Sequence, residues 1–259
     1  MDKISNLLKK FHLLQNKGFS KKLGQNFILD KNILDKIVDL AGNVTDEHVL
    51  EIGSGVGSLS ERILLRHPKT FTIIEKDSRC IEAVRSWLKV DIKQEDALKV
   101  DYCDMFALQQ PLKIIANLPY NIASKLLIKF CLVRYLIKDM TLMFQKEVAD
   151  RIVAVPSTKD FGKLSVMAQT YFDCQIVKVL PPSVFVPAPK VTSALVYFKP
   201  ILDVNVDIEA LSDLTQKLFS KRRKILAASL SKTLLQTHNI SPQERVENLS
   251  VHMFHQLIK

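Results

Sequence analysis

Three of the seven glycines of this 259-residue chain stand at alternate positions, Gly53, Gly55 and Gly57. They follow a short apolar run and precede a helical pattern, where glycine permits a tight turn and a close approach of the backbone to a ligand. Such a turn can also be purely structural. A dinucleotide would require a third glycine at position 58, which is Ser. The spacing therefore favours an adenosyl ligand without phosphates, such as S-adenosylmethionine.

Carboxylates stand beside this turn and after the next two predicted strands. Glu51 precedes the first glycine, Glu75 ends the second strand, and Asp96 lies just past the third. A carboxylate in the position of Glu75 can accept hydrogen bonds from both hydroxyls of a ribose, and Asp96 could accept one from an adenine amino group. Either of these two could instead be a solvated carboxylate at a strand end. Together with the turn, they predict a crevice that binds an adenosine.

The segment Asn117-Leu118-Pro119-Tyr120 follows a fourth apolar strand and suits the methylation of an exocyclic amine. The lone pair of such an amine is delocalised into its ring, so the nitrogen is a poor nucleophile. An Asn side-chain oxygen and a backbone carbonyl can accept both amino hydrogens and free the lone pair, while proline stiffens the loop and tyrosine offers a stacking face. Positioning and electrostatics would then carry the catalysis, without a metal or a covalent nucleophile. The alternative is an ordinary turn, which the neighbouring glycine turn disfavours.

These segments need a scaffold that brings them together. Short apolar strands alternate with helical patterns, which is typical of a mainly parallel sheet covered on both faces. In such α/β folds ligands bind outside the carboxyl ends of the strands, so the turn, the carboxylates and the tetrapeptide should share one crevice. Strands are expected at 49–52, 71–74, 90–92, 112–116, 140–144, 176–180 and 194–198, and helices at 33–41, 58–65, 78–88, 122–136, 208–219, 225–235 and 246–258.

After residue 200 only helical patterns remain, and we place a domain boundary there. Residues 1–200 would form the cofactor-binding domain, with a basic N-terminal segment over 1–31, and residues 201–259 a small helical domain. The first 17 residues, apolar and lysine-rich, are expected to include an amphipathic surface helix rather than a transit peptide.

The charge balance points to a polyanion as partner. Lys and Arg number 37 against 27 Asp and Glu, a net charge of +10, so nucleic acid is the first expectation and an anionic membrane surface the second. The expected phosphate contacts are Lys21, Lys22, Lys221, Arg222, Arg223 and Lys224, although a run such as 221–224 can also be a solvated helix face.

Two further features of the sequence concern membrane insertion and metal binding. No uncharged run is long enough for a membrane helix. The four cysteines lack zinc-ligand spacing, so we expect ordinary thiols in a reducing cytoplasm, and no metal site.

Seven ordered blocks give the chain a resemblance that covers nearly its whole length. It resembles the bacterial ribosomal RNA small-subunit adenine dimethyltransferases, which make adjacent N6,N6-dimethyladenosines near the 3′ end of 16S RNA. The blocks are Lys22–Asp30, Glu51–Gly57, Glu95–Leu98, Asn117–Tyr120, Phe144–Arg151, Gly162–Val166 and Phe185–Val191. Ser54 stands where the bacterial pattern usually has Pro, which should loosen the turn, and Thr192 replaces a frequent Asp.

The resemblance implies a Rossmann-like class I fold that binds S-adenosylmethionine. Asn26 and the Ile28 backbone would close over the methionine end of the cofactor, with Gly53 and Gly55 in the turn beneath it. Glu75 would hold the ribose, Asp96 the adenine amine, and Asn117 would sit between cofactor and target base. Tyr120 looks like one stacking partner of the target adenine. Phe185 is a second candidate, with core packing as its alternative.

The same resemblance implies a partner and a place of action. The helical C-terminal region resembles an RNA-docking module, and the substrate would be a 3′-terminal hairpin loop of 16S RNA in the 30S subunit or its precursor. We expect a cytoplasmic, monomeric enzyme that does not bind membranes. Two alternatives stay open: the related enzyme that dimethylates one adenosine of 23S RNA and confers macrolide resistance, and a non-catalytic RNA-binding assembly or transcription factor on the same fold.

Overall fold

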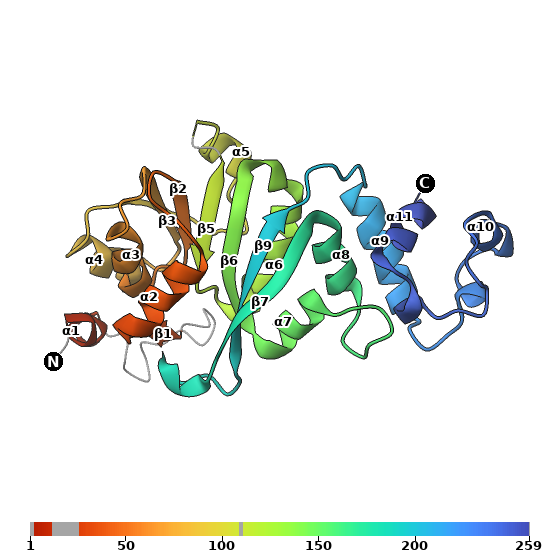
Figure 1. The fold of residues 1–259 in the computed structure, drawn as a ribbon. Helices are drawn as coiled ribbons and strands as arrows, with labels where there is room; N and C mark the ends of the chain where they lie inside the picture. Colours follow the sequence, from red (N-terminus) through yellow and green to blue (C-terminus); the bar gives the residue numbers. More distant parts are fainter. Residues whose placement is uncertain (1–2, 12–25, 109–110, 259) are drawn as a thin grey trace.

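The computed structural model describes residues 3–11, 26–108 and 111–258. Its centre is a seven-stranded sheet in the order β4-β3-β2-β5-β6-β9-β7 (Figure 1). The strands β2 to β6 are parallel, whereas β9 runs antiparallel to both β6 and β7. The predicted α/β class with a mainly parallel sheet is confirmed. The strands are β2 (His48–Ile52), β3 (Thr70–Glu75), β4 (Asp91–Gln94), β5 (Leu112–Ala116), β6 (Ile137–Gln145), β7 (Phe172–Leu180) and β9 (Ser193–Pro200).

Successive residues of the central strands enter two different cores, because side chains alternate across a sheet. Leu50 and Ile114 face the core that includes α6, while Val49 and Ile115 face the core that includes α2, α3 and α4. Both faces of the sheet are therefore covered, which explains why these strands read as continuous apolar runs. The helices are α2 (Lys31–Leu40), α3 (Ser58–Leu64), α4 (Ser78–Arg85), α5 (Tyr102–Met105) and α6 (Tyr120–Leu132).

The start and end of α2 show how local chemistry sets these elements. The Asp30 side chain accepts hydrogen bonds from the backbone N–H groups of Asn32 and Ile33, as an N-cap residue does. Gly42 follows the helix with φ of +78°, a conformation that glycine adopts without a steric penalty. Asp30 also ends the segment that leads to the cavity described below, so the cap fixes where that segment meets the helix.

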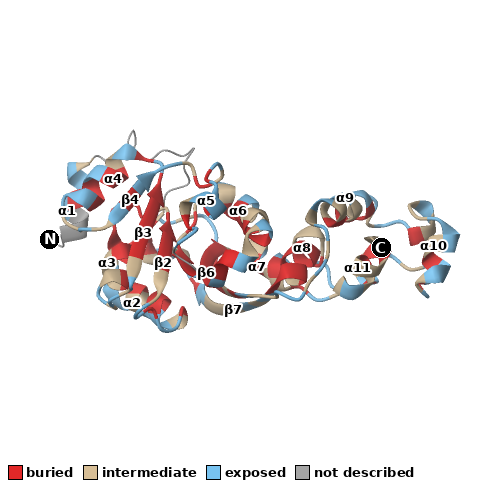
Figure 2. Ribbon diagram, turned by 90° about the horizontal axis from the view of Figure 1, so that it is seen from above, coloured by how far each residue is buried: buried red, intermediate tan, exposed pale blue. Residues whose placement is uncertain are grey.

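The C-terminal helices pack onto the sheet domain through α8. This helix touches α6 and α7 on one side and α9 and α11 on the other, and buried residues form one continuous core across them. The Phe219 ring lies 6.1 Å from that of Phe161 and 5.8 Å from that of Phe254. The molecule is elongated, with α1 near one end and α10 at the other (Figure 2). The helices are α7 (Lys146–Val153), α8 (Lys163–Tyr171), α9 (Ile208–Phe219), α10 (Lys232–Thr237) and α11 (Val251–Ile258).

Two predicted C-terminal helices need correction. The prediction of one helix at 225–235 is wrong. A 3-10 turn at Leu226–Ala228 is followed by the separate helix α10, which Ser231 caps. The pattern at 246–258 is likewise divided between a 3-10 turn at Val246–Asn248 and α11. Helix 208–219 has the predicted bounds. The domain boundary near residue 200 stays a prediction.

Two N-terminal features lie outside the main sheet. The helix α1 (Lys3–Lys10) occupies part of the expected amphipathic segment. Two short strands, β1 (Phe27–Ile28) and β8 (Phe185–Val186), pair with each other antiparallel. No helix of the described residues has the length and apolar character to cross a membrane.

Candidate active site

The glycine turn leaves the carboxyl end of β2 and enters α3. Gly53, Gly55 and Gly57 have φ values of +77°, +55° and +84°, so each adopts a backbone conformation that other residues avoid. The Gly53 N–H donates to the carbonyl of Ile74 at 2.9 Å, which ties the turn to β3. The chain thus reverses over a very short path and leaves room above the ends of the strands.

Glu75 stands at the end of β3 and holds the turn from the side. Its Oε2 accepts the Gly55 N–H at 3.2 Å, and its Oε1 accepts the backbone N–H groups of Lys76 and Asp77 at 2.8 and 2.9 Å. Burial raises the pKa of Glu75, and these three hydrogen bonds to the charged form partly offset the effect. The carboxylate is therefore fixed in orientation at the edge of the cavity.

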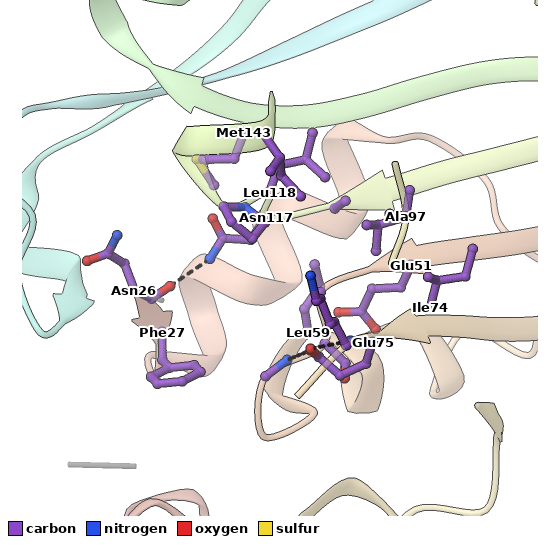
Figure 3. A pocket seen from close by; sticks show the side chains of 18 of the residues that line it. Asn26, Phe27, Glu51, Leu59, Ile74, Glu75, Ala97, Asn117, Leu118 and Met143 are labelled. Carbon is purple, nitrogen blue, oxygen red and sulfur yellow. Dashed lines mark hydrogen bonds between the residues drawn. The ribbon is translucent and has the colours of Figure 1, made fainter. Parts of the chain in front are cut away.

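Glu51 is the most deeply buried carboxyl group of the site, at 1% exposure. Its Oε2 accepts a 2.5 Å hydrogen bond from the hydroxyl of Ser60 on α3. Loss of solvation raises the pKa of Glu51 to about 8; the Ser60 bond opposes this shift and the charge of Glu75 adds to it. At neutral pH Glu51 is accordingly held mainly in the protonated form. Figure 3 shows Glu51 and Glu75 side by side in the cavity.

Asp96 lies after β4, further along the same cavity. Its Oδ2 accepts a 2.9 Å hydrogen bond from the Lys76 ammonium group, and its Oδ1 accepts the Leu98 N–H at 3.0 Å. The Lys76 bond, followed by that from Leu98, lowers the pKa of Asp96. Asp96 is therefore ionised, in contrast to Glu51.

Asn117 follows β5 and faces the N-terminal segment across the cavity (Figure 3). Its Nδ2 donates a 2.9 Å hydrogen bond to the backbone carbonyl of Asn26. This bond leaves the amide oxygen Oδ1 as the acceptor of the side chain. Pro119 is the N-cap of α6, and the hydroxyl group of Tyr120 bonds to that of Ser193 at 2.5 Å. The tetrapeptide is therefore held in place by β5 before it, by α6 after it and, through Ser193, by β9.

These predicted residues meet in one cavity, as the sequence indicated. Ten of the eleven residues expected to contact the cofactor or the base line it, all but Phe185: Asn26, Ile28, Gly53, Gly55, Glu75, Asp96, Asn117, Leu118, Pro119 and Tyr120. The carboxyl ends of β2 to β5 supply most of them, which is where a doubly wound sheet binds its ligand.

Comparison with known proteins agrees with this geometry. Residues 16–259 match the ribosomal RNA adenine dimethylase family. The chain belongs to this family. It is 43% identical to ribosomal RNA small subunit methyltransferase A of a Wolbachia from Brugia malayi, over 95% of this chain and 97% of the relative. It is 39% identical to the same-named protein of Cereibacter sphaeroides strain ATCC 17025, over 90% of this chain and 89% of the relative.

Solved structures give the same result for the fold. A dimethyladenosine transferase of Plasmodium falciparum superposes with a TM-score of 0.76 at 26% identity, over 89% of this chain and 95% of that one. The 23S rRNA methyltransferase ErmE superposes with a TM-score of 0.64 at 22% identity, over 90% of this chain and 98% of that one. The predicted membership of an rRNA adenine dimethylase family, the class I methyltransferase fold and the SAM-dependent activity are confirmed.

The cavity suits S-adenosylmethionine. Among the described residues that line it, Lys76 is the one basic side chain, and it is paired with Asp96, so the cavity offers little to a phosphate. A Cβ on Gly53 would point toward Pro119, 3.5 Å away, and would fill space between the turn and the tetrapeptide. The Ser54 hydroxyl is buried without a described protein partner, which leaves a hydrogen-bonding group available beside the cavity. Glu75 and Asp96 line the cavity with carboxylate oxygens that could accept hydrogen bonds from an adenosine, and Asn26 and Ile28 line it as well.

Phe185 does not reach the cavity. It stands opposite Ile28 in the β1–β8 pair, but its side chain is 2% exposed and packs in the core with α2 and α3. The ring cannot stack on a base from this position, because no face of it is accessible. The structure places Phe185 in the core rather than in the site, in agreement with the core-packing alternative.

The expected phosphate contacts fall into two groups. Lys21 and Lys22 lie outside the described residues. Lys221, Arg223 and Lys224 are exposed after α9. Arg222, in contrast, donates hydrogen bonds to the Glu247 carboxylate at 2.6 Å and to the Thr158 carbonyl at 3.0 Å. Arg222 thus links the end of α9 to the 3-10 turn before α11 and to the loop between α7 and α8, a role that the charge run did not indicate.

The sequence did not reveal several lining residues. Met143 on β6 borders the cavity but lies in a plain apolar strand that carries no chemical signal. Phe27 also lines the cavity. It lies in the sequence between the predicted residues Asn26 and Ile28, so it was easier to infer than Met143. Among the described residues, no group of three or more His, Cys, Asp or Glu side chains is placed to hold a metal ion.

Proposed function

We propose that this protein dimethylates the N6 amines of two adjacent adenosines in a 3′-terminal hairpin loop of 16S RNA, within the 30S subunit or its precursor. The names of the two relatives given above, both small-subunit methyltransferases, support the choice of RNA. The observation that carries the chemistry is the Asn117 side chain, oriented by the Asn26 carbonyl at the mouth of the adenosine-binding cavity.

The tetrapeptide prepares the target amine. Asn117 Oδ1 accepts one amino hydrogen of the adenine. The carbonyl of Pro119 is occupied by the N–H groups of Ile122 and Ala123, so we assign the second amino hydrogen to the Leu118 carbonyl. Two acceptors draw the nitrogen out of conjugation and direct its lone pair into the cavity. When bound, S-adenosylmethionine supplies an electrophilic methyl group on a positively charged sulfur.

Tyr120 offers the base a surface. Its hydroxyl group is anchored on Ser193, which fixes the plane of the ring at the cavity wall. A base that has left its helical stack regains stacking energy there, of about 1–3 kcal/mol. Because most of the assistance is positional, we assign the rate enhancement to orientation of amine and methyl group in line.

The exposed basic residues Lys221, Arg223 and Lys224 would contact RNA phosphates, in keeping with the net charge of +10. We also propose that residues 201–259 act as the RNA-docking unit, and that the enzyme works as a cytoplasmic monomer. Sedimentation equilibrium of the purified protein tests the last point, since a stable dimer would contradict it.

The decisive experiment is the transfer of labelled methyl groups to purified 30S particles and to 23S RNA in parallel. We expect transfer to two adjacent adenosines of 16S RNA, and none to 23S RNA. Transfer to 23S RNA alone would assign the macrolide-resistance activity instead. Binding of S-adenosylmethionine and of RNA without any transfer would favour the non-catalytic alternative.

A further inference from the structure

A small hydrophobic cluster joins four separate segments beside the cavity. Its buried members come from α1, β1, the glycine turn and α4, and it lies apart from the two cores of the sheet. We call it the Phe27 cluster. It consists of Leu8, Phe27, Val56, Cys80 and Ala83, with Phe11, Leu29 and Trp87 partly buried around them.

Phe27 connects this cluster to the cofactor cavity. A Cβ built on Gly55 would lie 2.5 Å from Cε1 of the Phe27 ring, so the ring occupies the space that a side chain on the turn would fill. Phe27 also lines the cavity, together with Asn26 and Ile28 on either side. The position of this ring therefore sets how closely residues 26–28 approach the glycine turn.

The opposite side of the cluster is closed by α1. Leu8 is fully buried at 0% exposure, whereas Asn6 on the same helix is exposed. The helix lies near α4 at the end of the molecule (Figure 2). It precedes residue 16, where the match to the family begins. The helix α1 thus packs against the segment that borders the cavity.

We propose that Leu8 is a positioning residue for the cofactor: by packing in the Phe27 cluster it keeps the Phe27 ring on Gly55 and holds residues 26–28 over the cavity. Leu8 touches neither cofactor nor RNA. It acts through Phe27, whose ring lies against the glycine turn at Gly55. The proposal rests on the assignment of this cavity to S-adenosylmethionine.

The chain contains its own probe for the test. Trp87 is its one tryptophan, it packs against the Phe27 cluster, and its Nε1 donates to the Val56 carbonyl of the glycine turn at 3.1 Å. Its fluorescence should therefore respond to cofactor binding and report dissociation in stopped-flow mixing. Hydrogen exchange of the Ile28 amide provides a second, independent reading of the segment.

In Leu8→Ala we expect S-adenosylmethionine to dissociate at least about tenfold faster. The KM for the cofactor should rise while kcat at saturating cofactor stays near that of the wild type, a split that general destabilisation would not produce. Leu8→Met, which keeps the volume of the side chain, should restore the wild-type rate. Asn6→Ala is the matched control on the exposed face of α1.

A milder variant guards against loss of folding. Phe11→Ala removes a ring at the partly exposed edge of the cluster and should shift the dissociation rate in the same direction by a smaller factor. Unchanged dissociation in both Leu8→Ala and Phe11→Ala would overturn the proposal. Failure of the cofactor assignment is distinguishable, because the wild-type protein would then show no binding of S-adenosylmethionine at all.

Discussion

The side-chain amide of Asn117 and the backbone carbonyl of Asn26 are joined by a 2.9 Å hydrogen bond, although 91 positions separate the two residues. One bond thus serves two purposes. It orients the Asn117 amide, whose Oδ1 we assign to the target amine in the proposed mechanism, and it holds the N-terminal segment against the cavity.

Asn117→Ala should remove both contributions. We expect methyl transfer to fall by at least about 100-fold, since a preorganised acceptor at the reacting nitrogen is lost. Cofactor binding should survive in weakened form because Glu75 and Asp96 remain. Single-turnover transfer and calorimetric titration with S-adenosylmethionine measure the two effects separately, and full transfer activity in the variant would contradict the mechanism.

Two glycines with positive φ provide a matched pair for the turn. Gly55→Ala places a methyl group 2.5 Å from the Phe27 ring, whereas Gly42→Ala has no heavy atom within 4 Å. Both substitutions introduce backbone strain of about 1 kcal/mol. Only Gly55→Ala should also displace Phe27, so we expect a loss of cofactor affinity of about tenfold or more there and an unchanged affinity in Gly42→Ala. Equal affinities in the two variants would show that Phe27 does not limit binding.

Glu51 predicts a dependence of stability on pH. Its pKa is about 8 in the folded protein, against an ordinary value of 4.5, so between these values the native state binds a proton that the unfolded chain releases. The free energy of unfolding should therefore fall as pH rises through this window, by up to about 1.4 kcal/mol per pH unit from this group.

Glu51→Gln imitates the protonated carboxyl and can still accept the Ser60 hydroxyl. The variant should match the wild type below about pH 5 and exceed it in stability by a few kcal/mol near pH 8. Urea unfolding at several pH values measures this difference, which would have to be constant with pH if the Glu51 proton were irrelevant.

In the basic run after α9, Arg222 is bonded within the protein, whereas Lys221, Arg223 and Lys224 are exposed. Arg223→Glu with Lys224→Glu should weaken binding to 30S RNA and reduce its salt dependence, by about one unit in the slope for each phosphate contact, while cofactor affinity stays unchanged. Arg222→Glu should in addition lower the melting temperature, because it breaks the contacts with Glu247 and the Thr158 carbonyl. An unaltered salt slope in the double variant would exclude phosphate contacts at this place.

Periodic elements could be predicted from the sequence, whereas elements defined by tertiary contacts could not. Strand 112–116 and helix 208–219 have the expected bounds, because the strand is a short apolar run with clear ends and the helix has a clear apolar period. The helix α8 was missed because it is buried on nearly all sides and carries no polar face to mark it. The pair β1–β8 joins residues about 160 positions apart, and neither strand is long enough to show a pattern.

In the site, too, some features could be predicted from the sequence, whereas others depend on tertiary contacts. Glu75, Asp96 and the glycine turn were predictable, since each lies at the end of a strand whose place in the sheet is fixed by topology. The raised pKa of Glu51 and the contact of Phe27 with Gly55 depend on what packs around them. For Phe185 the sequence left base stacking and core packing open, and the structure places the ring in the core.

The packing of α8 against both halves of the molecule has a consequence for substrate choice. Because α6, α8, α9 and α11 share one core, the basic run after α9 and the mouth of the cavity cannot change their separation freely. An RNA bound at both points would therefore have to span a fixed distance between them. The enzyme could then reject loops of the wrong reach whatever their bases, and accept a folded particle that presents its adenosines at the right span.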